Sequence, residues 1–341
     1  ATTLLFGALI GTAKDDIKKA LAASTMSQIG YMILATGLGP VGYAFAIMHL
    51  LTHGFFKAGM FLGAGSVMHG MNDEVNMRRY GAIRKVMPIT AATFGLGYLA
   101  ILGVPPFAGF YSKDKIIETA FNAGGVQGIL LGGATLFGAA VTAFYMTRVF
   151  VLTFTGTKRW DENAHPHEPS ILMWLPMVIL AIGSVTSGFL LSTGNALVNW
   201  LEPVVNESQE HHEHEFLPPI VVSSMALTFV AIGVGLAIFK YRTVPTQAPE
   251  NVSIFTRAAR KDLYQDSFNE AVFMRPGQRL TSALVTTDNK VVDGLVSLVG
   301  WLVQTIAGAT RAIQNGYVRS YALIMVLGVI ALLGAIWMVT L

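Results

Sequence analysis

The stretch Pro105-Pro106-Phe107-Ala108-Gly109-Phe110 interrupts an apolar segment, residues 88–122, that is too long for one simple membrane crossing. Proline removes a backbone donor and clashes with the preceding turn, so this segment is predicted to be a broken helix. Lys113-Asp114-Lys115 follows the break directly, with Glu118 one turn further on. Broken backbone at membrane depth is tolerated where it lines a wet cavity, and a buried charge there costs about 2.5 to 3.5 kcal/mol. The stretch therefore favours charge movement over the alternative of a harmless proline kink.

The composition predicts an integral membrane protein. Of 341 residues, 53% are hydrophobic and 13% are charged, whereas soluble domains carry about 25% charged residues. The chain has no cysteine, which excludes disulfides, cysteine-ligated iron–sulfur clusters and thiol catalysis. Its glycines lie in apolar helices without a phosphate-binding context, so we expect no nucleotide, redox cofactor or metal on this chain. The sequence starts at Ala1 part-way through an apolar helix, and we interpret it as the later part of a longer polypeptide.

The apolar segments predict an all-α polytopic fold with about eight transmembrane helices, one truncated and one broken. They are residues 1–13, 20–38, 41–69, 88–122, 126–155, 171–200, 217–239 and 320–341.

The basic residues alternate sharply between connections. Nineteen of the 23 Lys and Arg residues fall in connections on one side of the predicted membrane, and the connections near 39–42, 122–128 and 201–216 contain none. By the positive-inside rule, the basic connections face the cytoplasm and the C-terminus faces outward. The four remaining basic residues lie inside predicted spans: Lys57, Lys113, Lys115 and Arg148.

The segment 243–319 is predicted to be a long amphipathic helix along the cytoplasmic surface. Apolar residues from Val291 to Ile306 repeat at helical spacing, and Asn315-Gly316 is a plausible C-terminal cap. The alternative is a short interfacial helix, split from loops at Pro276-Gly277. We accordingly divide the chain into a core (1–155), additional transmembrane helices (156–242), the lateral helix (243–319) and a terminal anchor (320–341).

His49, His53 and Lys57 recur every four residues and therefore share one face of a membrane helix. Histidine titrates near neutral pH, so this face suits a proton relay. A zinc site and satisfied polar packing are the rival interpretations, although no third metal ligand is evident. Histidines at 211, 212 and 214 are expected in a solvated loop.

Other polar residues of the spans are assigned less sharply. Ser24-Thr25-Met26-Ser27-Gln28 could hold waters between helices, whereas Lys18 is expected at the cytoplasmic rim. Arg148 either pairs with an acidic group on a neighbouring helix or extends to the surface. Lys115 and Glu118 complete the charged cluster around Lys113.

Several of these motifs resemble the antiporter-like subunits of respiratory complex I. They are Asp16-Ile17-Lys18-Lys19, Ser24 to Met32, His49 to Lys57 and Gly109-Phe110-Tyr111-Ser112-Lys113-Asp114. The resemblance implies that Lys113, with Asp114, belongs to the outward half-channel, and that His49 and His53 belong to a hydrated central axis. It also implies a lateral C-terminal helix against neighbouring subunits, and an inward half-channel on earlier helices outside this chain.

The function implied by the resemblance is proton export in the bacterial plasma membrane. NADH, FMN, iron–sulfur clusters and quinone are expected on partner subunits of the NADH–quinone oxidoreductase. The large subunit of a multi-subunit cation/proton antiporter is an alternative, and a structural clamp of the membrane arm is another.

Overall fold

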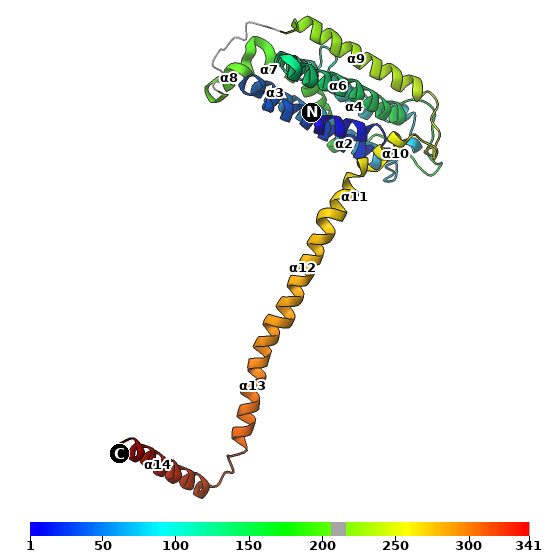
Figure 1. The fold of residues 1–341 in the computed structure, drawn as a ribbon. Coiled ribbons are helices and arrows are strands. Elements are labelled where there is room, and N and C mark those ends of the chain that lie inside the picture. The colour runs from blue at the N-terminus through cyan, green and yellow to red at the C-terminus, as the bar shows by residue number, and fades with distance from the viewer. Residues whose placement is uncertain (206–215, 341) are drawn as a thin grey trace. The chain divides into compact units, whose positions relative to one another are not determined.

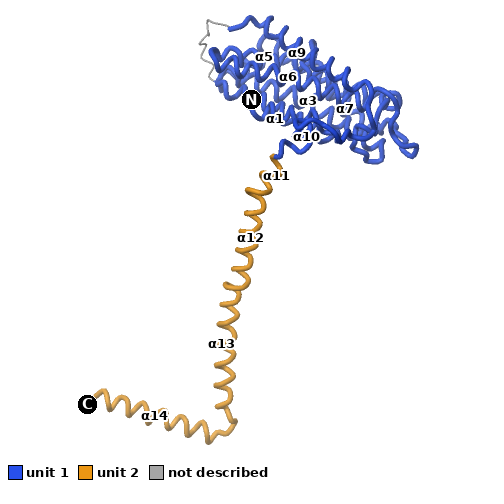
Figure 2. Tube along the Cα trace, turned by 45° about the vertical axis from the view of Figure 1, so that its right-hand side comes forward, with its two compact units in different colours: residues 1–264 blue, residues 265–341 orange. Residues whose placement is uncertain are grey.

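The computed structural model describes residues 1–205 and 216–340, and the elements within these ranges are helices. An isolated β-bridge joins Asp16 to Asn76 in two connections. The chain divides into two compact units, residues 1–264 and 265–341 (Figure 2). The all-α architecture predicted from the sequence is confirmed.

The first unit is a bundle of long helices packed side by side (Figure 1). Its helices are α1 (Thr2–Gly11), α2 (Ile17–Gly37), α3 (Pro40–Gly70), α4 (Pro88–Leu102), α5 (Ala108–Asn122), α6 (Gly125–Phe154), α7 (Ile171–Ser192), α8 (Ala196–Val205), α9 (Pro219–Lys240) and α10 (Ile254–Arg260).

Local sequence explains where the helices begin. Proline occupies the first position of α3, α4 and α9, where its missing N–H costs no helical hydrogen bond. The carboxylate of Asp16 caps α2 by accepting from the backbone N–H groups of Lys18 (2.8 Å) and Lys19 (3.1 Å). Lys18 itself is exposed in the first turn, as expected for a residue at the rim.

Glu168, in the connection before α7, caps α4 from a distance in sequence. Its carboxylate accepts from the backbone N–H of Thr90 (2.8 Å) and from the Thr90 hydroxyl (2.9 Å). A carboxylate in the first turn satisfies an otherwise unpaired donor and complements the helix dipole. We expect Glu168→Ala to lower the free energy of unfolding by about 1 kcal/mol, measured by thermal unfolding of the purified protein. Glu162→Ala, in the same connection and exposed, should leave the midpoint unchanged; equal midpoints for both variants would contradict the cap.

The break in residues 88–122 is present. Helix α4 ends at Leu102, the peptide bond between Pro105 and Pro106 is cis, and α5 begins at Ala108. Gly103 turns the chain with a φ of +80°, which favours glycine. The two half-helices therefore meet inside the bundle.

Each predicted span contains a helix, and by length and composition six described helices could cross a membrane. They are Pro40–Gly70, Gly125–Phe154, Ile171–Val205, Pro219–Lys240, Asp262–Arg311 and Val318–Thr340. Helix α1 and the two half-helices are shorter. The count of eight crossings stays a prediction.

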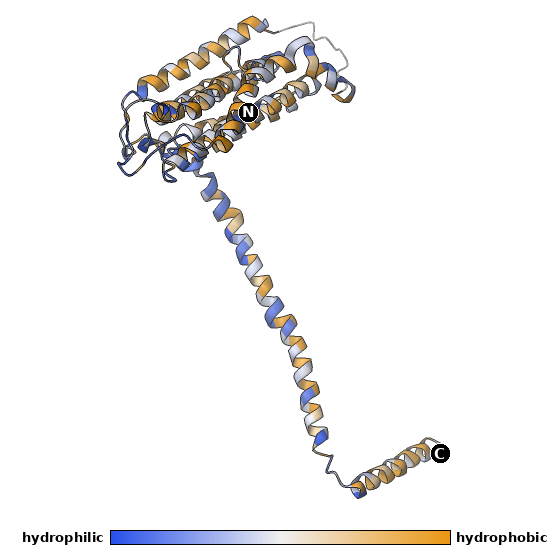
Figure 3. Ribbon diagram, turned by 180° about the vertical axis from the view of Figure 1, so that it is seen from behind, coloured by the Kyte–Doolittle hydropathy of each residue, from blue (hydrophilic) through white to orange (hydrophobic). Residues whose placement is uncertain are grey.

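The second unit contains one long helix and a terminal apolar helix. The long helix runs through α11 (Gln265–Asn269), α12 (Arg275–Thr287) and α13 (Asp293–Arg311), joined by π-helical turns at 270–274 and 288–292. Pro276 lies in the first turn of α12, directly after a π-turn, and does not split the helix. Hydrophilic and hydrophobic residues are mixed along α12 and α13, whereas α14 (Val318–Thr340) is mostly hydrophobic (Figure 3).

Two boundaries differ from those predicted for the lateral segment. Helix α13 ends at Arg311, and Asn315-Gly316 lies in the following turn, where Gly316 has a φ of +75°. The Asn315 side chain accepts from Tyr317 N (3.1 Å) and so supports the turn into α14 instead of capping α13. Residues 243–264 belong to the first compact unit, because they contact its connections.

Candidate functional site in the bundle interior

His49 lies at the centre of a hydrogen-bonded group that joins three helices. Its Nδ1 is 2.9 Å from the Ser112 hydroxyl of α5, and its Nε2 is 3.2 Å from Oε1 of Gln28 in α2. The Ser112 hydroxyl is also 3.0 Å from the hydroxyl of Thr52. All four side chains are fully buried. Both ring nitrogens of His49 therefore have protein partners, which favours a hydrogen-bonded role over the zinc interpretation.

His53 and Lys57 continue the same face of α3. The rings of His49 and His53 lie with centroids 6.0 Å apart. The Nε2 atom of His53 and the Nζ atom of Lys57 are buried and have no hydrogen-bond partner among the described residues. Buried polar groups in proteins are almost always satisfied by protein or by ordered water. This face is therefore suited to hold water.

Lys113 lies where the two half-helices meet. Its Nζ donates to the carbonyl of Ile101 in the last turn of α4 (3.4 Å) and lies 5.4 Å from the centre of the Tyr31 ring. The last carbonyls of a helix carry partial negative charge, so the end of α4 stabilises a cation at this position. Ser112, the preceding residue, connects the same turn of α5 to His49.

Asp114, the residue after Lys113, lines a cavity of about 200 Å³. Other lining residues are Phe45, Lys115, Glu118, Ser192, Asn195 and Ser223. Ser192 ends α7, Asn195 follows it, and Ser223 lies in the first turns of α9, at the end of the bundle opposite the basic connections. Lys115 is 44% exposed and pairs with Glu118 at 3.0 Å. The cavity thus reaches the Lys113–Asp114 pair from the side that has no basic connections.

Arg148 occupies a different place from the one expected deep in a span. It lies near the end of α6, is 1% exposed, and bonds to the carboxylate of Asp15 and to the carbonyl of Lys14 in the connection between α1 and α2. Arg78 pairs with the other oxygen of Asp15 at 2.9 Å. Of the two alternatives for Arg148, the structure therefore has the acidic partner, although Asp15 belongs to a connection and not to a neighbouring helix. Neither Arg148 nor Lys18 contacts His49 or Lys113.

Gln28, Thr52, Ser112 and Tyr31 join the predicted residues by geometry. Gln28 was expected only to hold water, and no role was predicted for the other three. Thr52 lies three residues after His49, so its spacing could have indicated it, whereas no local signal connects Ser112 with His49.

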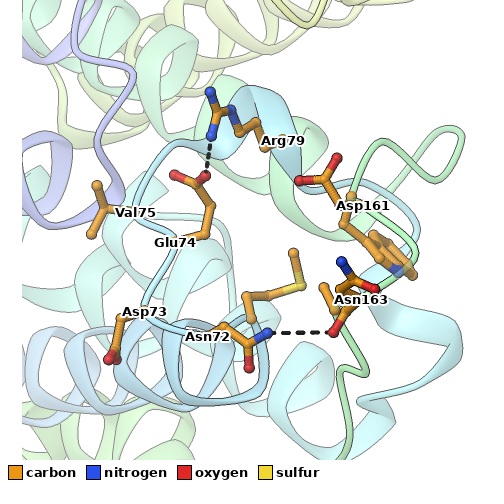
Figure 4. A pocket seen from close by; sticks show the side chains of 10 residues that line it. Asn72, Asp73, Glu74, Val75, Arg79, Asp161 and Asn163 are labelled. Atoms are coloured by element: carbon orange, nitrogen blue, oxygen red, sulfur yellow. Dashed lines mark hydrogen bonds and ion pairs between the residues drawn. The ribbon is translucent and has the colours of Figure 1, made fainter.

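A second hollow, of about 470 Å³, lies among the basic connections (Figure 4). There Arg79 pairs with Glu74 at 2.9 Å, and Asn72 Nδ2 donates to the carbonyl of Asn163 (3.4 Å). Partial burial acts to raise the pKa of Glu74, but hydrogen bonds from Asn76 N–H and from Arg79 outweigh it and lower that pKa. Polar side chains of this surface hollow bond to one another, and the hollow is separate from the buried groups around His49. Histidines 211, 212 and 214 lie outside the described residues.

Comparisons with known proteins agree with this architecture. Residues 1–138 match the family described as NADH:quinone oxidoreductase/Mrp antiporter, transmembrane. The chain is 59% identical, over its whole length and 54% of the relative, to subunit L of NADH-quinone oxidoreductase from Mycobacterium tuberculosis. It is 39% identical, over 95% of its length and 53% of the relative, to NAD(P)H-quinone oxidoreductase chain 5 from Picosynechococcus. The chain thus spans about half the length of the curated relatives it matches.

Two solved structures share the fold. The Mrp complex from Dietzia contains a chain that is 24% identical with a TM-score of 0.57, covering 92% of this chain and 33% of that one. The archaeal membrane-bound sulfane sulfur reductase contains one that is 23% identical with a TM-score of 0.54, covering 98% of this chain and 54% of that one. With these relatives and this helix arrangement, the chain belongs to the antiporter-like membrane subunits found in NADH–quinone oxidoreductases.

Proposed function

We propose that this chain is a proton-translocating subunit of an NADH–quinone oxidoreductase. One observation carries the proposal: Lys113 lies at a helix break inside the bundle, and its two neighbours in sequence reach the His49 group (Ser112) and a cavity at the non-basic side (Asp114). A buried amine that follows a histidine-bonded hydroxyl in sequence and precedes a carboxylate facing a cavity is placed to receive and release a proton through intervening water.

The geometry supports a simple sequence of proton transfers. His49 passes a proton through the Ser112 hydroxyl to a neutral Lys113 amine, and His53 and Lys57 supply protons to His49 through intervening water. The charged ammonium of Lys113 is stabilised by the Ile101 carbonyl and by Asp114. When the charge of a nearby group changes, the Lys113 ammonium releases its proton into the cavity beside Asp114. Lys115 and Glu118 line its path outward.

The other parts of the proposal follow from family and charge pattern. NADH, FMN, iron–sulfur clusters and quinone belong to partner subunits, and other membrane-arm subunits contact the lateral helix. The basic connections face the cytoplasm of a bacterium, and the C-terminus faces outward. Residues 1–155 form part of the translocation core, with 320–341 as an anchor.

The decisive test is Lys113→Met in the assembled complex, with Lys85→Met as its control. Methionine keeps most of the volume but cannot carry a proton, so proton pumping per electron should fall at least tenfold. Lys85 is exposed and lies outside both the His49 group and the cavity, so its variant should pump nearly normally. Pumping is measured as acidification with reconstituted vesicles during NADH oxidation. Normal pumping by Lys113→Met would refute the proposal.

The Mrp fold neighbour favours a second candidate, cation/proton exchange. In that case, vesicles containing the purified complex would exchange sodium for protons without any quinone reduction. The 59% identity to an oxidoreductase subunit makes the first candidate the stronger one.

A further inference from the structure

A stripe of hydroxyl and amide groups runs along the interface between α2 and α6. Helix α2 contributes Ser24, Ser27 and Gln28, and helix α6 contributes Thr142 and Tyr145. All five side chains are fully buried. Burying a polar group without a partner costs about 1 to 3 kcal/mol. Apolar residues of similar size would hold two membrane helices together without that cost, so the stripe requires another explanation.

The groups gather around the Tyr145 hydroxyl, but among the described residues most of them do not meet it or each other with hydrogen-bond geometry. The Tyr145 hydroxyl donates to Ser24 at 3.0 Å. By contrast, Ser27 Oγ, Gln28 Nε2 and Thr142 Oγ1 are buried without a hydrogen-bond partner among the described residues. Interhelical hydroxyls that act as adhesive form direct pairs. Three unpaired groups in one interface instead offer the two to four polar contacts that a buried water requires.

The stripe is continuous with the His49 group at one end. Gln28 accepts from His49 through its Oε1 atom, at 3.2 Å, while its Nε2 atom is among the unpaired groups of the stripe. One side chain therefore belongs both to the proposed relay and to the α2–α6 interface. Water bound at Gln28 Nε2 would be one hydrogen bond away from the relay.

The other end of the stripe reaches the basic connections. Arg148 follows Tyr145 by about one turn of α6, and its Nε atom is again buried without a partner among the described residues. Its terminal nitrogens hold Lys14 and Asp15, and the Asp15 side chain is 20% exposed. The Arg148–Asp15 pair therefore stands between the stripe and the aqueous surface.

We propose that the α2–α6 interface is a hydrated proton passage that connects the basic face of the bundle to His49, with the Arg148–Asp15 pair at its mouth. The proposal rests on the proposed function, because it supplies protons to the same relay. Its ligands are water and the proton. This chain would then hold an inward route of its own in addition to the outward route beside Asp114.

The test compares two threonines of α6 in the assembled complex. Thr142→Val removes the hydroxyl of the stripe at almost constant volume and should lower proton pumping per electron at least fivefold, whereas Thr142→Ser should restore it. Thr147→Val is the matched control, because Thr147 is 2% exposed on the same helix and its hydroxyl pairs with Tyr98 at 2.8 Å, outside the stripe. Normal pumping by Thr142→Val would overturn the passage. If Lys113→Met stops pumping in the same assay, the proposed function stands even so.

Labelling keeps the passage testable if Thr142→Val does not assemble. These 341 residues contain no cysteine, so Ser27→Cys introduces the single thiol of this part of the subunit. In reconstituted vesicles, methanethiosulfonate ethylammonium should label it at least tenfold faster from the basic side than from the other. The exposed apolar position Ile33→Cys should show no such preference. Equal rates at Ser27→Cys from both sides, or no labelling, would contradict the passage.

Discussion

Gly109→Ala should prevent α5 from packing closely against α4 at the break, and the variant should not fold normally. An alanine Cβ at this position would lie 1.9 Å from the carbonyl oxygen of Ala100 and 3.0 Å from its carbonyl carbon. Both are backbone atoms, so no side chain can rotate out of the way. Overpacking usually costs about 1 to 3 kcal/mol, and a backbone clash of this kind belongs above that range.

The surroundings give the break no room to relax. On a second face of α5, Gly188 of α7 packs so closely that a Cβ there would lie 2.6 Å from the Cα of Ala108. Moving α5 away from Ala100 would therefore push it against α7, and would also withdraw Lys113 from the Ile101 carbonyl. The same contact that makes glycine necessary thus positions the charged side chain.

The measurement is the thermal unfolding midpoint of the purified protein, together with the yield of assembled complex on native gels. Gly133→Ala is the control, because Gly133 lies in α6 and a Cβ there would meet no atom within 4 Å. That variant should be neutral or gain up to about 1 kcal/mol from the higher helix propensity of alanine. A wild-type midpoint for Gly109→Ala would contradict the packing described at the break.

The fold was largely predictable, because its main signals are local. Pro105-Pro106 removes donors wherever it occurs in a helix, so the amino-acid sequence alone places the break. The spacing of His49, His53 and Lys57 likewise puts them on one face of any α-helix. The end of α13 was predicted wrongly, because Asn315-Gly316 is a good cap in isolation, yet the chain needs those residues to turn into α14.

The partners of the candidate site could not be predicted, because they are separated widely in sequence. Ser112 and Gln28 contact His49 across 63 and 21 residues, and nothing in their local sequence specifies this meeting. The position of Arg148 depends on Asp15, 133 residues away. The local sequence shows that a charged residue lies within an apolar segment and therefore needs a partner. Only the tertiary structure shows which residue that partner is.

Arg148→Met should be the second most damaging substitution, costing about 3 to 5 kcal/mol of stability. Breaking a buried ion pair costs about this much, and Asp15 then keeps one of its two cationic partners, Arg78. Here the loss also leaves the carbonyl of Lys14 without its donor, and removes the cation that lies 5.4 Å from the centre of the Tyr241 ring at the end of α9. Three separate segments of the basic face would lose one shared contact.

Arg79→Met separates this effect from a general loss of positive charge. Arg79 is 60% exposed and pairs with Glu74, so its removal should cost less than about 1 kcal/mol. The double variant Asp15→Ala/Arg148→Met should be less damaged than the sum of its single variants, because each single variant already breaks the contact that the two residues share. Thermal unfolding of the wild type, the two single variants and the double variant measures this difference in stability. Additive effects would mean that Arg148 and Asp15 act independently, and the closed mouth assigned to the α2–α6 passage would then lose its physical basis.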